Sequence, residues 1–185
     1  MINWTYLKNS NRFKILTVIT TISLIIGVIL FLKINNNIDV SKINLEVLLR
    51  NNISIHISIF FIIFFLSFLY LGTIFGITIY IFEIICLVIL SLFLISNFFL
   101  KGIFLSLLIL CFRLPYYLLI FLNSLNSLKI SKFIMCKENR ERVILIRYIK
   151  KSIFLSLIAI SIEFFNYFFG YKIIIFLNNL LGIMI

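Results

Sequence analysis

Charged side chains are scarce in this sequence: they make up 12% of its 185 residues, and only six residues are acidic. Hydrophobic residues make up 63% of the chain, whereas a soluble domain contains about 45–50% apolar and about 25% charged residues. A water-soluble fold of this length cannot hide so many apolar side chains, because its surface needs polar residues to cover it. The composition therefore excludes an ordinary soluble domain and predicts an integral membrane protein.

Cysteine is also rare, and its three copies, Cys86, Cys111 and Cys136, form no CxxC pair. An odd number of isolated cysteines supplies neither a disulfide framework nor a zinc site. Two of the three lie inside apolar runs, where a free cysteine behaves as a small hydrophobic residue. We therefore expect no disulfide and no metal.

Sequence signatures of catalysis are missing as well. The chain contains no HExxH, GxSxG or DxxD sequence. The glycine patterns of P-loops and of dinucleotide-binding folds are absent too. We therefore expect neither enzymatic activity nor a bound cofactor.

The formal net charge of +11 has two interpretations. In a soluble protein it would suggest binding to nucleic acid. Here the basic residues crowd at the ends of apolar runs, where they determine how the chain is oriented in a membrane. We therefore expect membrane lipids as partners and no nucleic acid.

The apolar runs predict an all-α bundle of about five membrane-spanning helices, in a single membrane domain that covers residues 1–185. The run from Ile53 to Leu100 has 48 residues without Lys or Arg. As one helix it would be about 72 Å long, against a hydrocarbon core of roughly 30 Å, so it must form two helices. The predicted spans are 15–32, 53–73, 76–96, 103–126 and 152–169.

The break inside the long run has a candidate at "GTIFG", Gly72 to Gly76. The same residues match GxxxG, a pattern that lets membrane helices pack closely. We favour a turn here over a helix interface. A second break is expected at "SNFFLKG", residues 96–102.

Charge predicts the orientation. Clusters of Lys and Arg stay on the cytoplasmic side, and five helices place both the basic N-terminus and the basic loop 129–151 there. The N-terminus is then cytoplasmic, and the loop 33–52 and the C-terminus are external. The basic loop also resembles an amphipathic helix that touches anionic lipid headgroups, and the alternative is a signal that only fixes orientation. Its eight basic residues are Lys129, Lys132, Lys137, Arg140, Arg142, Arg147, Lys150 and Lys151.

Three charges fall inside predicted spans: Glu83, Arg113 and Glu163. A charge near the bilayer centre costs about 2.5–3.5 kcal/mol on insertion scales, so each should face protein or water. An ion pair of Arg113 with one acid would leave the other acid neutral or hydrogen-bonded. The cluster is either a proton or ion path, or a fastening that fixes which helix faces meet, and we favour the second.

Polar side chains surround Arg113 in the sequence "FRLPYYLL". Pro115, the only proline, removes a backbone donor and is expected to bend the helix beside that charge. Tyr116 and Tyr117 place hydroxyl groups nearby. His56 stands alone at the start of the second span, near the interface, and we expect no ligand role for it.

Two stretches carry a family pattern. In "KGIFLSLLILCFRLPYYLLIFLNSLNSLKISKFI", residues 101–134, a glycine opens a helix with a Leu-Pro pair and a serine-rich polar end. In "YIKKSIFLSLIAISIEFFNYF", residues 148–168, an acid near the end of the last helix stands at Glu163. Both stretches resemble the stage II sporulation protein M family, whose five spans, external loop and basic loop occur in the same order. The matched positions of the first stretch are Gly102, Ser106, Leu114, Pro115, Leu118 and Leu119.

The resemblance implies a non-enzymatic scaffold of the engulfment machinery, located in the mother-cell or septal membrane of a spore-forming bacterium. Family members hold two peptidoglycan-degrading partners, an amidase/endopeptidase and a lytic transglycosylase. The expected docking sites are the external segments 33–52, 96–102 and 170–185, or helix faces that include Gly72 and Gly76. The chain departs from the family in two respects. Its external loop is short, and its third predicted span lacks the several glycines common in the family and carries Glu83 instead. The alternative is a small transporter or permease subunit that uses Glu83, Arg113 and Glu163.

Overall fold

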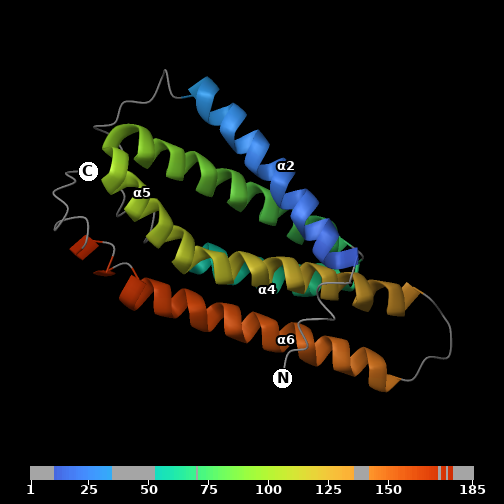
Figure 1. The fold of residues 1–185 in the computed structure, drawn as a ribbon. Helices are drawn as coiled ribbons and strands as arrows, with labels where there is room; N and C mark the ends of the chain where they lie inside the picture. Colours follow the sequence, from blue (N-terminus) through green and yellow to red (C-terminus); the bar gives the residue numbers. More distant parts are fainter. Residues whose placement is uncertain are drawn as a thin grey trace.

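The computed structural model describes residues 11–34, 53–69, 71–135, 142–170, 172–173 and 175–176, and all of these except the turn at Phe68–Leu69 are helical (Figure 1). The expected all-α fold is confirmed for these residues. Most of the expected loop 33–52 and most of the C-terminal tail lie outside them. The elements are α2 (Asn11–Ile34), α4 (Ile53–Ser67), α5 (Leu71–Met135), α6 (Arg142–Phe165) and a π-helical turn, η3 (Asn166–Gly170).

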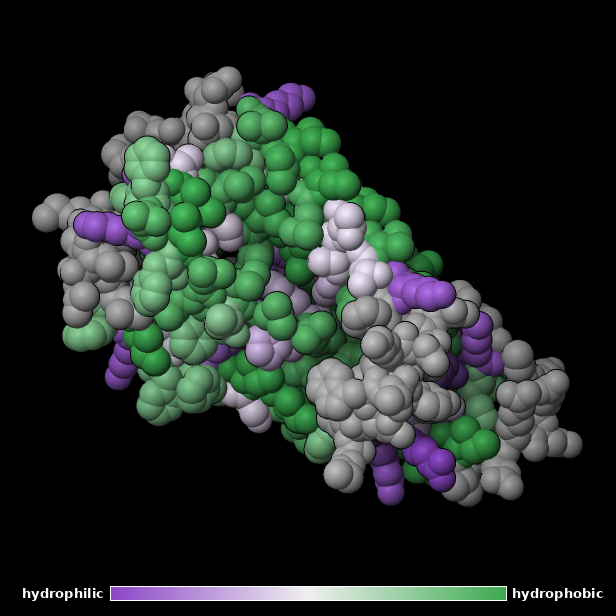
Figure 2. Space-filling model, in the orientation of Figure 1, coloured by the Kyte–Doolittle hydropathy of each residue, from purple (hydrophilic) through white to green (hydrophobic). Residues whose placement is uncertain are grey.

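Three helical segments are long and apolar enough to cross a membrane: Lys14–Lys33, Leu71–Ile134 and Ile144–Gly170. A shorter apolar helix covers Ile55–Ser67. The visible surface is dominated by hydrophobic residues, and the strongly hydrophilic ones lie toward its ends (Figure 2). These features are compatible with a membrane protein, because soluble monomers rarely expose large contiguous apolar surfaces.

Helix α5 is two helices joined at Phe99, whose backbone angles of φ 50° and ψ −124° are not helical. The chain reverses its direction there, so the residues before and after Phe99 run side by side (Figure 1). The break expected within residues 96–102 is confirmed. Pro115 lies inside the second half of α5, and Phe99 alone has non-helical angles in this helix, so the proline does not interrupt it.

The turn between α4 and α5 lies before the two glycines, not at them. Backbone hydrogen bonds from the Phe68 amide to the Phe65 carbonyl (3.2 Å) and from Leu69 to Leu66 (3.1 Å) close it. The prediction of a turn at Gly72–Gly76 is therefore wrong, since both glycines lie inside α5.

The two glycines serve close helix packing instead. A side chain at Gly72 would collide with Ser127, and one at Gly76 would collide with Ser124, both in the second half of α5. The glycines thus let the two antiparallel halves of α5 approach each other. Both glycines are buried within this chain, so the close packing that they allow in the described structure is within the chain itself.

The expected basic loop is shorter than predicted, because most of it is helical. Helix α5 continues to Met135 and α6 begins at Arg142, so the segment 142–151 is the start of α6 and not a separate surface helix. Lys and Arg are good helix formers, which lets both helices extend past the apolar runs.

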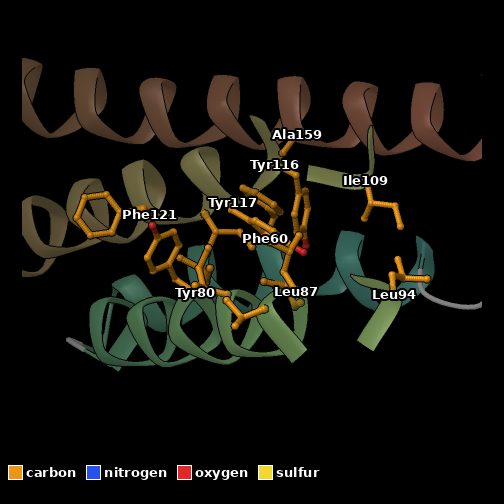
Figure 3. Packing of buried hydrophobic residues seen from close by; sticks show 14 of the residues in the cluster. Phe60, Tyr80, Leu87, Leu94, Ile109, Tyr116, Tyr117, Phe121 and Ala159 are labelled. Atoms are coloured by element: carbon orange, nitrogen blue, oxygen red, sulfur yellow. The ribbon is translucent and has the colours of Figure 1, made fainter. Parts of the chain in front are cut away.

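The hydrophobic core lies between α4, the two halves of α5 and α6. Tyr116 and Tyr117 point from the second half of α5 into this core, and Ala159 of α6 packs beside them (Figure 3). Helix α2 joins from outside, where the hydroxyl groups of Thr20 and Tyr80 are 2.8 Å apart. Because α4, both halves of α5 and α6 meet in one core, polar side chains from three helices can gather there.

Candidate functional site: a buried charged cluster

Helices α4, α5 and α6 bring Arg113 together with five other polar side chains. We call this group the charged cluster. It combines all three intramembrane charges expected from the sequence with the two tyrosines and the histidine. Its members are His56 of α4, Glu83, Arg113, Tyr116 and Tyr117 of α5, and Glu163 of α6.

Arg113 and Glu163 form an ion pair between α5 and α6. The Arg113 Nη1 atom lies 3.4 Å from each carboxylate oxygen of Glu163. The Glu163 side chain is 5% exposed and that of Arg113 is 13% exposed, so water screens the pair little. The predicted pairing of Arg113 with one acid is confirmed, and it holds the two helices in one register.

The hydrogen bonds of His56 assign its tautomer. Arginine can only donate, so His56 Nε2, 3.2 Å from Arg113 Nη1, must be the acceptor. The proton then lies on Nδ1, which donates to the Tyr116 hydroxyl at 2.8 Å. That hydroxyl donates in turn to the His56 carbonyl at 3.2 Å. His56 is therefore a neutral ring that links α4 to Arg113.

Glu83 is the acid without a cation in contact within the described residues. Its Oε1 atom lies 3.8 Å from Nδ1 of the neutral His56, and Tyr117 lies nearby. The two acids thus have different surroundings: Glu163 is paired with Arg113, and Glu83 faces neutral side chains. This agrees with the expectation that Arg113 pairs with one of the two acids.

The backbone beside Pro115 obtains a donor from the π-helical turn. Asn166 of η3 donates from Nδ2 to the carbonyl of Phe112 at 3.1 Å. That carbonyl lies three residues before Pro115. Because proline has no N–H, the carbonyl four residues before it, that of Cys111, loses its regular helix donor, so Asn166 adds a donor to the neighbouring carbonyl and does not replace the missing one. Side chains of neighbouring helices commonly bond to the backbone near prolines in membrane helices, so η3 supports α5 at this point, as α6 does at Arg113.

A second polar layer fastens the other end of the same helices. The Ser131 hydroxyl donates to the Ser67 carbonyl at 2.5 Å and joins α5 to α4. Two further bonds join α5 to α6. Ser152 donates to Asn123 Oδ1 at 2.6 Å, and Asn126 donates to the Tyr148 carbonyl at 2.8 Å. The bundle is thus tied by polar contacts at two levels.

Sequence reasoning missed one member of the charged cluster, His56, and the neighbouring contact of Asn166 with the Phe112 carbonyl. His56 was expected near the interface without a role, but it is 4% exposed and touches both Arg113 and Tyr116. The sequence did contain a signal for His56. Burying a histidine in an apolar run is costly unless it is hydrogen-bonded, so its position there indicates a polar partner in the bundle. Among the described residues, no group of three His, Cys, Asp or Glu side chains forms a metal site.

The chain belongs to the class of helical proteins whose segments are long and apolar enough to span a membrane. No protein-family model, no curated protein and no solved structure matches it. Its function is therefore inferred from the bundle and the charged cluster.

Proposed function

We propose that this protein is a multi-pass scaffold of a bacterial cell membrane that resembles the stage II sporulation protein M family. In this role it holds a peptidoglycan amidase/endopeptidase and a lytic transglycosylase at the mother-cell or septal membrane during engulfment. It performs no chemistry itself. It provides a rigid body in the lipid, to which the partners attach on the external side.

The observation that carries the proposal is the pairing within the charged cluster. Arg113 contacts Glu163 of α6 and His56 of α4, so one side chain of α5 fixes the position of two other helices. A buried charge can specify how helices align. A bundle fastened in this way suits a scaffold, whose partners need a fixed surface.

Five crossings, with the N-terminus cytoplasmic and the C-terminus external, complete this proposal. The start of α2, the turn at Phe68–Leu69 and the facing ends of α5 and α6 lie at one end of the bundle (Figure 1). That end carries Lys14, Lys132 and Arg147, and basic residues favour the cytoplasmic side. Reporter tags inserted at residue 138 should be inaccessible from outside the cell, and tags at residue 99 accessible. External accessibility of the tag at 138 would contradict this orientation.

The turn at Phe99 is the external segment at which we place partner docking. Phe99 and Leu100 are 77% and 81% exposed, and exposed apolar residues that stand together mark interaction sites. The double variant F99S/L100S should lower copurification of the two hydrolases at least tenfold, because the apolar contact is lost. The matched control is F68S/L69S, which changes the apolar pair of the turn at the opposite end and should leave copurification unchanged.

Two outcomes would contradict the scaffold. Equal loss in both double variants would show that copurification depends on general stability and not on the turn at Phe99. The second outcome concerns the alternative function, a small transporter that uses Glu83, Arg113 and Glu163. The gathering of these charges with His56 in one buried cluster favours it. If proteoliposomes of the purified protein show a proton flux that Glu83→Gln abolishes, the protein is a transporter.

A further inference from the structure

Helix α6 presents three basic side chains on one outward face. Arg147, Lys150 and Lys151 are spaced by three and four residues, so they lie above one another on the helix. All three are exposed. None of them has a hydrogen bond or ion pair with other residues in the part of the chain that the structure describes. They are thus available to an anionic partner.

The same face continues as an apolar groove of about 380 Å³. The groove begins one turn after Lys150 and keeps the same helical spacing, so the basic group and the groove form one stripe. The buried residues of α6, among them Leu155, Ala159 and Glu163, point to the core instead. The groove is lined by Phe154, Leu157, Ile158, Ser161, Ile162 and Phe165.

The length of the groove matches one leaflet of a bilayer. From Phe154 to Phe165 the helix rises about 16 Å, and half of the hydrocarbon core is roughly 15 Å. The basic group stands immediately beyond this length, at the level of lipid headgroups. The positions of charge and groove therefore agree with those of a phosphate and an acyl chain in one phospholipid.

We propose that this face of α6 binds an anionic phospholipid, with its phosphate between Arg147, Lys150 and Lys151 and one acyl chain in the groove. An acyl chain needs no hydrogen bonds, and the groove offers none: its single hydroxyl, that of Ser161, already donates to the Leu157 carbonyl at 3.0 Å. The cationic end complements the headgroup. The site does not depend on the scaffold function.

Native mass spectrometry of the detergent-purified protein with equimolar phosphatidylglycerol and phosphatidylcholine of the same acyl chains tests this site. The wild type should retain phosphatidylglycerol preferentially. K150Q/K151Q should weaken its binding about 25-fold, because each basic residue near an anionic surface contributes about fivefold. The matched control K14Q/K132Q also removes two positive charges. They lie at the start of α2 and at the end of α5, which are at the same end of the bundle as the basic group, and this variant should keep the binding.

The groove is tested separately by Ser161→Phe, which fills it, with Thr21→Phe on the exposed face of α2 as the control. Only Ser161→Phe should reduce retention of phosphatidylglycerol, and glycerol phosphate without acyl chains should not compete.

Equal losses in K150Q/K151Q and K14Q/K132Q would overturn the proposal, because the attraction of the lipid to the protein would then be diffuse. Equal retention of the two lipids, or copurification of a protein that phosphatidylglycerol displaces from this face, would overturn it too.

Discussion

Replacing Arg113 with Met should lower the free energy of unfolding by about 3–5 kcal/mol, the cost of leaving one partner of a buried ion pair without the other. The carboxylate of Glu163 would lose its cation, since Arg113 Nη1 contacts both of its oxygens at 3.4 Å. His56 Nε2 would lose its donor at the same time. Denaturation in detergent micelles, followed by circular dichroism, measures this change.

A double-mutant cycle separates loss of the pair from general damage. R113M/E163M removes both charges and should be more stable than R113M, because no buried charge is left without a partner. Lys132→Met also replaces a basic side chain with Met, but at an exposed position of α5. It should alter the free energy of unfolding by less than about 0.5 kcal/mol. If the effects of R113M and E163M simply add, the two side chains do not stabilise each other, and the cluster does not fasten the helices.

Composition and charge were sufficient to predict the all-helical fold, the break near Phe99 and the pairing of Arg113 with an acid. These features can be read from single segments: the polar stretch "SNFFLKG" interrupts the apolar sequence at residues 96–102, and an intramembrane charge needs a partner. The choice of Glu163 over Glu83 required the structure, because helix spacing within one segment does not encode contacts between segments.

The errors share a physical cause, which is packing between segments far apart in sequence. Gly72 and Gly76 looked like a turn because glycine interrupts helices, but their partners, Ser127 and Ser124, stand 55 and 48 positions later in the chain. His56 looked isolated for the same reason, since its contacts come from Arg113 and Tyr116, which stand 57 and 60 positions later in the chain. Local sequence patterns carry no information about such distant partners.

Gly102→Ala should destabilise the protein by about 3 kcal/mol, the upper end of the range for overpacking a filled site. A Cβ atom at Gly102 would meet the main chain of the first half of α5: the carbonyl carbon of Leu94 at 2.5 Å and the amide nitrogen of Ile95 at 2.9 Å. Main-chain atoms inside a helix cannot rotate away, so the two halves of α5 would have to separate next to the turn at Phe99. Thermal unfolding in micelles measures the loss.

The surroundings of other glycines provide a graded comparison for this result. At Gly27 the closest approach of a Cβ atom would be 2.9 Å, to Cβ and Cγ1 of Val88. This overlap is smaller than the one with the main chain at Gly102, so Ala there should cost less than at Gly102. At Gly170 the nearest atom, on the Phe112 ring, would be at an ordinary contact distance of 3.4 Å, so Gly170→Ala should be nearly neutral. If Gly102→Ala were as harmless as Gly170→Ala, residues 94 and 102 would not face each other, and the antiparallel arrangement of α5 that brings Glu83 to Arg113 would be wrong.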